Sequence, residues 1–304
     1  MKTKKSIFSN EVVWKKYLFV IAMLIVPIVH FAFFYIYINA SAFLLSFQYP
    51  LNDGSGMVKW GFDNYMTIFS QFKDADSTVI EAITNTLIWF VVTNFICMPL
   101  SLVICYFTYK KIRHYTFFRT VIYLPCIISG TILVVLFKYM VGTGGPLFAY
   151  MEKAGLEYIY IFKDPNYAMK GMLFYTISTS LGGNFVLFGG TMNSIPTEQI
   201  EAGKIDGCGP WRELISIIIP NIWPTLGTIW VMGFTSILSA SGPVYLFTNG
   251  QFGTQTLSFW IFDLTMKGTS GGDNLAAALG MLMSIVTIPI VLIVKRVTGV
   301  TKDA

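Results

Sequence analysis

Charged residues are scarce in this chain. Asp, Glu, Lys and Arg together make up 12% of its 304 residues, about half the share that is usual in a soluble domain. Hydrophobic residues make up 54%, and the mean hydropathy is +0.62. The abundance of Leu, Ile, Val and Phe excludes a disordered chain, and a soluble fold would have too few charges to cover its apolar surface. The composition therefore predicts a protein embedded in a lipid bilayer.

Motifs that hold cofactors or catalyse reactions are missing as well. The sequence contains no GxxxxGK[ST] phosphate loop, no HExxH or GxSxG motif and no paired zinc-ligand spacing. Its two histidines, His30 and His114, lie far apart, and its four cysteines form no CxxC pair. We therefore expect no enzyme activity, no metal site and no cofactor bound by this chain. The basic residues form short clusters between apolar runs, not a stripe with aromatic residues, which argues against a nucleic-acid partner.

Long apolar runs are what the sequence does contain. A helix needs about 20 apolar residues to cross the hydrocarbon core. Six runs meet this test: 17–47, 80–107, 120–141, 168–192, 221–247 and 275–294. The first run is longer than the apolar part of a signal peptide and has no obvious cleavage site, so we expect a retained span. The predicted fold class is an all-α polytopic membrane protein with six transmembrane helices.

The basic residues between these runs predict the orientation. Fourteen of the 21 Lys and Arg residues lie in the two tails and in the loops that share their side of the membrane. Cytoplasmic segments carry such an excess, so we expect both termini in the cytoplasm and a multi-pass protein of the cytoplasmic membrane. Along the chain we therefore predict a cytoplasmic tail over 1–16, a first helix over 17–47, an extracytoplasmic loop over 48–79, a five-helix core over 80–294 and a cytoplasmic tail over 295–304.

The cytoplasmic loop over 194–220 differs from the others. Pro196 suits the first turn of a helix, where its missing N–H is not needed, and Glu201 follows near the positive end of the helix dipole. Gly207 can adopt the left-handed conformation that ends a helix, and a second helix can begin at Pro210 and extend towards Pro220. A helix, a glycine turn and a second helix would lie across the cytoplasmic side, a shape suited to docking in another protein's groove.

The same loop resembles a known family. The run Glu201-Ala202-Gly203-Lys204-Ile205-Asp206-Gly207, followed by Ile219-Pro220, is similar to the EAA loop of binding-protein-dependent ABC importer permeases. It departs from the family pattern at Gly203, Cys208 and Ile219, where Ala, Ala and Leu are usual. Each substitute is small or apolar, which keeps docking plausible, although Gly203 weakens a helix by about 1 kcal/mol relative to Ala.

Further matches follow in the order of the carbohydrate branch of that family, the maltose-permease type. They are Gly61-Phe62-Asp63-Asn64-Tyr65, Asn85-Thr86, Phe118-Arg119-Thr120 with Tyr123-Leu124-Pro125, and Ser241-Gly242-Pro243. The chain lacks the large extracellular insertion of the maltose permease itself. The resemblance implies the permease fold of type I ABC importers.

The resemblance also implies partners and residue roles. A second homologous permease, two ATPase subunits that hold ATP and Mg, and an extracytoplasmic solute-binding protein that delivers a carbohydrate would complete the importer. The loop 194–220 would be the coupling helix in an ATPase cleft. Within it, Glu201 would make a charge-assisted contact with the ATPase, Ala202 and Gly203 would allow close approach, and Asp206 with Gly207 would fix the turn.

Polar and aromatic residues inside the predicted spans are candidates for the substrate path. Polar groups at lipid depth are costly and usually face a cavity or the bundle interior. The candidates are Trp89, Asn94, Lys138, Tyr175, Thr179 and Asn184. Aromatic rings could stack on sugar rings and amides could bridge hydroxyls. Each residue has an alternative role in helix packing, helix bridging or the interfacial aromatic belt.

Other classes of membrane protein share some of these features. An ion-driven secondary transporter or a channel would also have six spans and no phosphate loop, but such proteins usually show intramembrane charge pairs or inverted repeats with broken helices. A membrane scaffold would not need the loop 194–220. If the chain is an ABC importer permease, a transported solute other than a sugar is a further alternative.

Overall fold

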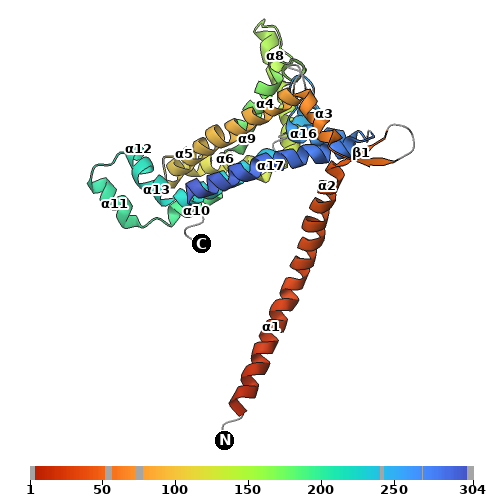
Figure 1. The fold of residues 1–304 in the computed structure, drawn as a ribbon. Helices are drawn as coiled ribbons and strands as arrows, with labels where there is room; N and C mark the ends of the chain where they lie inside the picture. The colour runs from red at the N-terminus through yellow and green to blue at the C-terminus, as the bar shows by residue number, and fades with distance from the viewer. Residues whose placement is uncertain (1–3, 52–56, 73–77, 240–242, 269, 300–304) are drawn as a thin grey trace.

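The computed structural model describes residues 4–51, 57–72, 78–239, 243–268 and 270–299, with side chains from Trp14 onwards. The fold is helical, as the sequence predicts, apart from one small hairpin (Figure 1). In that hairpin, strand β1 (Gln48–Pro50) pairs antiparallel with β2 (Val58–Trp60). Ser241 and Gly242, part of one motif of the resemblance, lie outside the described residues.

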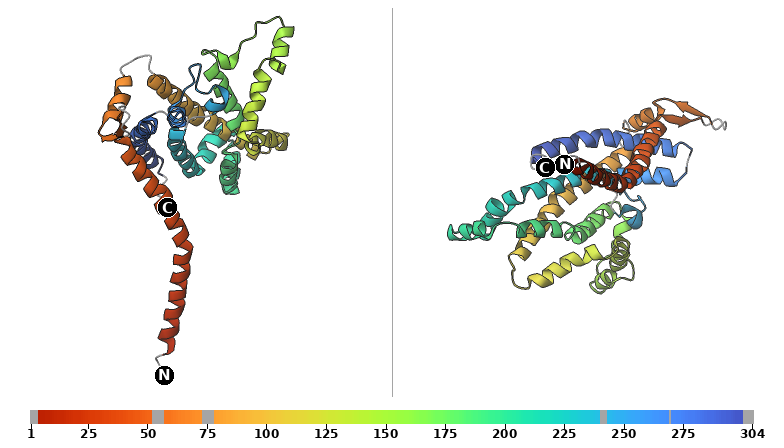
Figure 2. Two further views of the ribbon diagram at one scale, coloured as in Figure 1. Left: turned by 90° about the vertical axis from the view of Figure 1, so that its right-hand side faces the viewer. Right: turned by 90° about the horizontal axis from the view of Figure 1, so that it is seen from below.

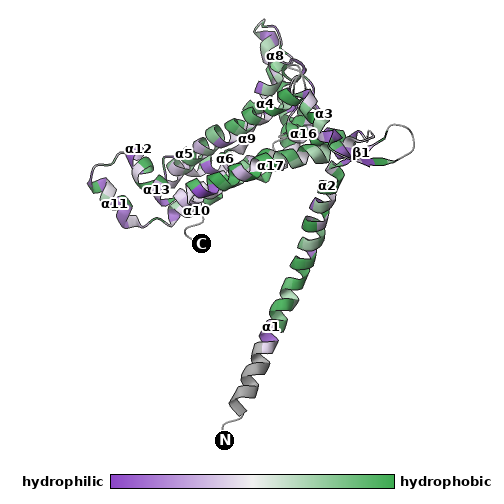
Figure 3. Ribbon diagram, viewed as in Figure 1, coloured by the Kyte–Doolittle hydropathy of each residue, from purple (hydrophilic) through white to green (hydrophobic). Residues whose placement is uncertain are grey.

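The N-terminal segment is one long rod that stands away from the bundle (Figure 1). It consists of α1 (Lys4–His30), a π-helical segment (Phe31–Tyr37) and α2 (Ile38–Ser46). Its most apolar stretch has no buried residue, and the main contact between the described rod and the bundle is that of α2 with the C-terminal helix α17 (Gly272–Thr298). From Trp14 onwards the rod therefore presents almost all of its apolar side chains outwards, and Figure 3 shows that this part of the rod consists mainly of hydrophobic residues.

The predicted extracytoplasmic loop is folded around one buried amide. After the hairpin, α3 (Asp63–Gln71) packs on α17. Asn64 is 3% exposed, and its Nδ2 donates to the carbonyl oxygens of Ser46 at 2.9 Å and Gln48 at 2.8 Å. These two bonds fix α3 to the end of α2 and the start of the hairpin.

Two predicted spans form continuous helices. The second follows α4 (Thr78–Val91), a π-helical segment (Val92–Cys97) and α5 (Met98–Tyr109) without a break, and the last follows α17. The π-helical segment precedes Pro99, which has no amide hydrogen to bond the preceding turn, so the backbone bonding pattern shifts there.

Two other predicted spans are broken. In place of one helix over 120–141, α6 (Tyr115–Ile127) ends just after Pro125 and α7 (Gly130–Val141) begins after an extended link. In place of one helix over 168–192, α9 (Ala168–Ser180) and α10 (Phe185–Asn193) are separated by a turn that contains Gly182 and Gly183. A Cβ on Gly182 would lie 2.5 Å from the carbonyl oxygen of Ile122, so only glycine lets this turn approach α6 so closely.

The remaining elements are shorter. They are α8 (Pro146–Lys153), a 3₁₀ turn (Ile161–Lys163), α11 (Thr197–Ile205), α12 (Pro210–Glu213), a π-helical turn (Leu214–Ile218), α13 (Ile219–Asn221), α14 (Trp223–Thr235), a 3₁₀ turn (Ser236–Ser239), α15 (Val244–Phe247) and α16 (Leu257–Met266). Helix α16 is absent from the prediction, because its ten residues are too few to count as a span.

Length and composition identify fewer spans than the six predicted. Within the described residues, four helical segments are long and apolar enough to cross a membrane: Trp14–Ser46, Thr78–Tyr109, Gly130–Lys153 and Gly272–Thr298. The pair Pro210–Asn221 and Trp223–Thr235, bent by 75°, adds a fifth when it is taken as one span. The chain is therefore a multi-pass membrane protein.

Three groups of buried side chains hold together the helices of the bundle, whose arrangement Figure 2 shows in two further views. The first joins α5, α10 and α14 with the segment 195–222. The second joins α3, α4, α16 and α17, and the third joins α4, α7, α9, α15 and α16. The first group matters most for function, because it ties the segment that differs from all other loops to the helices of the bundle.

Candidate functional site

A helix–turn–helix element projects from one end of the bundle (Figure 1). Pro196 caps the start of α11, Gly207 has a φ of +73°, and α12 begins at Pro210, so the local structure is the one that the sequence predicts. The amide of Gly207 donates to Lys204 O at 3.1 Å, and the amide of Cys208 donates to Gly203 O at 2.9 Å. This pair of bonds is the Schellman arrangement, which satisfies the last carbonyls of α11 and requires a left-handed residue at Gly207.

The residues of α11 divide into an outer and an inner face. Glu201, Ala202 and Asp206 are exposed, and Ile205 is exposed to 86%. These four side chains form the outer face of α11. Gly203 instead is buried, and a Cβ there would lie 2.5 Å from Ile217 Cδ1, so its close approach is to a residue of this chain.

The inner face of the element is part of the hydrophobic core. Ile200, Leu214 and Ile218 are at most 8% exposed and pack in the first buried group with residues of α5 and α10. Exposed Pro220 lies in α13, and the neighbouring Asn221 donates through Nδ2 to Gln199 Oε1 at 2.9 Å. The two arms of the element are thus fixed to each other as well as to the bundle.

Polar contacts attach the element to the end of α5, and the sequence reasoning missed them. Lys110 Nζ donates to both carboxylate oxygens of Glu213 at 2.9 and 2.8 Å, and Glu213 is 2% exposed. The fully buried Tyr106 donates through its hydroxyl to Pro210 O at 2.9 Å. The feature of the sequence that could have indicated these contacts is Glu213, a single carboxylate directly before an apolar run.

A cavity of about 310 Å³ brings together two of the predicted path residues, Asn94 and Asn184. Asn94 lies in the π-helical segment of the second span, and Asn184 lies in the turn between α9 and α10. Ser180, Ser236 and Gly233 also line the cavity, and none of its described lining residues is charged. The breaks in the helices thus place amide and hydroxyl groups around one space, the kind of lining that suits a polar, neutral ligand.

The other path candidates lie elsewhere. Trp89 and Tyr175 are buried in the third hydrophobic group, among side chains of α7, α15 and α16. Thr179 Oγ1 donates to Tyr175 O at 2.9 Å within its own helix. Lys138 Nζ donates to Leu246 O at 2.9 Å and so binds the end of α15. None of these four residues lines the cavity of about 310 Å³.

Comparisons with known proteins agree with this architecture. Residues 98–300 match the family of "binding-protein-dependent transport system inner membrane component". The chain is 26% identical over 248 residues to the alpha-glucoside transport system permease protein AglF of Rhizobium meliloti, an alignment that covers 76% of this chain and 69% of AglF. It is 25% identical over 304 residues to the sn-glycerol-3-phosphate transport system permease protein UgpA of Escherichia coli, covering 98% of each.

Solved structures show the same fold. A chain from the crystal structure of a bacterial ABC transporter involved in the import of the acidic polysaccharide alginate superposes with a TM-score of 0.80. The match covers 93% of this chain and 96% of that one at 21% identity. The family match extends over two thirds of the chain and includes both the helix–turn–helix element and most of the cavity. The chain belongs to the family of inner membrane components of binding-protein-dependent transport systems.

Proposed function

We propose that this chain is one of two homologous permease subunits of an ATP-driven importer that takes up a carbohydrate from an extracytoplasmic binding protein. The observation that carries this proposal is the element formed by α11 and α12. Its outer face, with Glu201 and Ile205, is open for a partner, while its inner face is fixed to the bundle. A projecting element with this division can transmit a partner's movement to the membrane helices.

In this proposal the partner at α11 is an ATPase. The ATPase subunits hold ATP and Mg, since this chain has no phosphate loop. Glu201 makes a charge-assisted contact with the ATPase and Ile205 enters an apolar depression beside it. When the ATPases close, the element moves as one body, because Glu213 and Pro210 are bonded to α5 through Lys110 and Tyr106.

In this proposal the chain crosses the bilayer six times, with both termini in the cytoplasm. The helices α6 and α7 together form the third span and α9 and α10 form the fourth, each with a break at depth. Such breaks are tolerated in a membrane where the irregular backbone is buried in protein or lines a cavity. The break between α9 and α10 meets this condition, because Ser180 and Asn184 line the cavity of about 310 Å³.

The second permease is supported by the long N-terminal rod. Its stretch Trp14–Ser46 crosses the membrane by length and composition, yet it is separated from the bundle along most of its course (Figure 2). A homologous subunit would pack between the rod and the bundle and would supply the other half of the substrate path.

A neutral carbohydrate is the substrate class that this cavity favours. Amides at Asn94 and Asn184 and hydroxyls at Ser180 and Ser236 can bond sugar hydroxyls, and the described lining offers no cation for a phosphate or a uronic acid. UgpA and the alginate transporter are named for anionic solutes, and the described lining of this cavity has no cation to bind such a solute.

The test is to purify the tagged chain gently from its membrane and to identify the proteins that accompany it by mass spectrometry. We expect a second permease and an ATPase with a phosphate loop, and Glu201→Lys should release the ATPase but retain the permease. Glu157→Lys, the same change at an exposed residue outside α11, is the control. An ATPase that remains bound to Glu201→Lys would contradict the coupling role, and a binding protein specific for a non-sugar solute would contradict the substrate class.

A further inference from the structure

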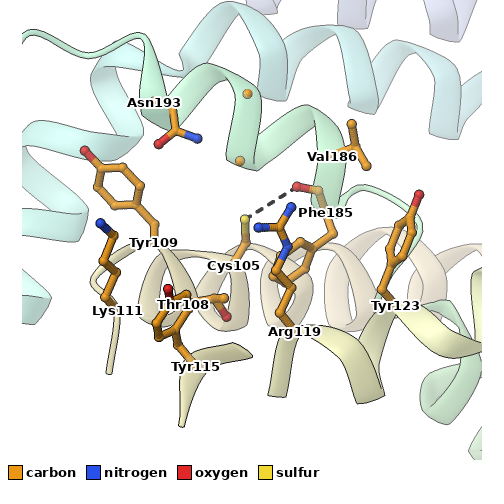
Figure 4. Close-up of a pocket in the computed structure, with 12 residues that line it drawn as sticks. Cys105, Thr108, Tyr109, Lys111, Tyr115, Arg119, Tyr123, Phe185, Val186 and Asn193 are labelled. Atoms are coloured by element: carbon orange, nitrogen blue, oxygen red, sulfur yellow. Dashed lines mark hydrogen bonds between the residues drawn. The ribbon is translucent and has the colours of Figure 1, made fainter. Parts of the chain in front are cut away.

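A second cavity, of about 450 Å³, lies between α5, α6 and α10 (Figure 4). Its walls include the last residues of α5 and α10 and the first turn of α6, so it lies at the end of the bundle that carries α11 and α12. It shares no lining residue with the cavity around Asn94 and Asn184. The transport path does not account for it.

Two cationic side chains line this cavity without a carboxylate partner. Lys111 lies at the α5–α6 turn, and Arg119 extends from α6 into the gap between α5 and α10, beside Cys105 and Phe185 (Figure 4). None of the lining residues is acidic. In the described part of the chain the ion pairs are Lys110–Glu213 and Lys267–Asp263, so neither Lys111 nor Arg119 forms an ion pair there.

Neutral hydrogen-bonding groups accompany the two cations. Tyr109 and Asn193 lie near Lys111, at one end of the cavity (Figure 4). Tyr115 and Arg119 are four residues apart on α6 and therefore share one face of that helix. Cations, phenol hydroxyls and an amide together form a donor set for the oxygens of a phosphate-type anion.

The other end of the cavity is apolar and open. Val186 is 63% exposed and Tyr123 is 36% exposed. The floor is formed by Gly189 and Gly190, and a Cβ on Gly190 would meet nothing within 4 Å. This end of the cavity is uncovered in the single chain, so an acyl chain can leave the cavity past Val186 and enter the bilayer.

We propose that this cavity binds the headgroup of an anionic phospholipid, with the phosphate between Lys111 and Arg119 and an acyl chain leaving past Val186. Basic pockets between transmembrane helices are suited to such headgroups. The assignment to the cytoplasmic leaflet rests on the proposed orientation of the importer. The binding site itself rests only on the lining of the cavity.

The site also borders the coupling element. Tyr109 and Lys111 line a further, smaller cavity together with Ile200, Glu201 and Lys204 of α11. A phosphate that draws Lys111 towards Arg119 leaves Glu201 with less positive charge beside it. The bound lipid would therefore increase the negative charge that α11 presents to its partner.

Native mass spectrometry of the detergent-solubilised full chain, with whatever subunits accompany it, tests the proposal. The protein is titrated with phosphatidylglycerol, with phosphatidylcholine and with inorganic phosphate. We expect the first phosphatidylglycerol to bind more tightly than phosphatidylcholine. Arg119→Gln and Lys111→Gln should each weaken it about fivefold, the effect of about one basic contact. Gly190→Leu fills the floor and should abolish the site with both charges intact.

Matched variants give each outcome a meaning. Lys170→Gln removes one exposed charge at the far end of the α9–α10 segment and should leave binding unchanged. Arg119→Lys keeps the charge and should retain binding even if Arg119→Gln fails to fold. Equal affinity for the two lipids, or unchanged binding in Gly190→Leu, would overturn the proposal. Inorganic phosphate that displaces phosphatidylglycerol at equal concentration would reassign the site to a free anion.

Neither result depends on transport. The binding measurement needs no ATPase and no sugar, so a failure of the importer assignment leaves it intact. Loss of the lipid site likewise leaves the co-purification of ATPase and permease unaffected.

Discussion

The ion pair between Lys110 and Glu213 offers a direct measure of how firmly the helix–turn–helix element formed by α11 and α12 is attached. Lys110→Met removes the cation and leaves a carboxylate that is 3% exposed without its partner. Breaking a buried ion pair in this way costs about 3–5 kcal/mol. Because the Lys110 side chain is 25% exposed, we expect the lower value, about 3 kcal/mol. At about 2–4 °C per kcal/mol, the thermal midpoint should fall by about 6–12 °C.

The double variant Lys110→Met, Glu213→Leu separates charge from packing. Apolar residues of similar volume in place of a buried pair are often neutral or stabilising, so the midpoint should return towards that of the unmodified chain. Thermal unfolding in detergent, followed by circular dichroism at the helix band, measures both variants. Lys267→Met is the control, because the pair Lys267–Asp263 lies within one helix, Lys267 is 64% exposed, and exposed pairs contribute about 1 kcal/mol or less.

Two results would refute this reasoning. If Lys110→Met unfolds at the same temperature as the unmodified chain, Glu213 is not held by the pair. If the double variant is as unstable as the single one, the loss arises from the shape of the Lys110 side chain and not from an unpaired charge.

Three further predictions concern glycines. Gly182→Ala places a Cβ 2.5 Å from Ile122 O and should cost about 1–3 kcal/mol in thermal unfolding, whereas Gly183→Ala, whose Cβ would lie 3.4 Å from Ser180 O, should cost less. Gly207→Val forces a branched residue to a φ of +73° and should lower sugar uptake at unchanged membrane abundance; normal uptake would exclude the turn from coupling. Gly233→Ala would put a Cβ 1.8 Å from Asn94 Oδ1, so the amide must turn; we expect a higher KM for uptake with ATPase binding unchanged, and an unaltered KM would place the sugar elsewhere.

The helix–turn–helix element formed by α11 and α12 could be predicted, because the residues that determine its shape act on the local backbone. Pro196 and Pro210 each restrict their own backbone, Gly207 permits a left-handed turn, and their spacing leaves room for one short helix between Pro196 and Gly207. The structure agrees with the sequence on the left-handed turn at Gly207 and on the start of α12 at Pro210, whereas Pro196 lies at the N-cap and not in the first turn of α11. The division of α11 into an exposed and a buried face could not be predicted in the same way, because it depends on Ile217 and the core behind it.

The spans could be predicted by length but not by continuity. The runs 80–107 and 275–294 are helical throughout, whereas 120–141 and 168–192 are each interrupted. The average hydropathy of a run hardly changes with a single proline such as Pro125 or with the two glycines Gly182 and Gly183. Each of these features nevertheless determines where the helix is interrupted. Helix α16 was not predicted for a different reason. Its ten apolar residues are too few to pass a test based on bilayer thickness.

Partners that are distant in sequence account for the rest. Lys110 and Glu213 are 103 positions apart, and a single sequence gives no reason to pair them. The cavity likewise needs Asn94, Asn184 and Gly233 from three different segments. Among the predicted path residues, the two asparagines share a cavity while Trp89 and Tyr175 are core residues, and residue type alone does not separate these outcomes.

The two candidate sites are joined by one helix. The continuous helix from Thr78 to Tyr109 carries Asn94, which lines the cavity of about 310 Å³. The end of this helix holds the helix–turn–helix element through Tyr106 and the adjacent Lys110. At about 1.5 Å per residue, Asn94 and Lys110 are separated by about 24 Å along the helix axis. Because a packed helix does not compress, a displacement of α11 has to reach the cavity as a tilt of this helix or as a change in its π-helical turn. That turn contains Asn94, so a residue that lines the cavity lies at the point of the helix where the hydrogen-bonding pattern is already altered.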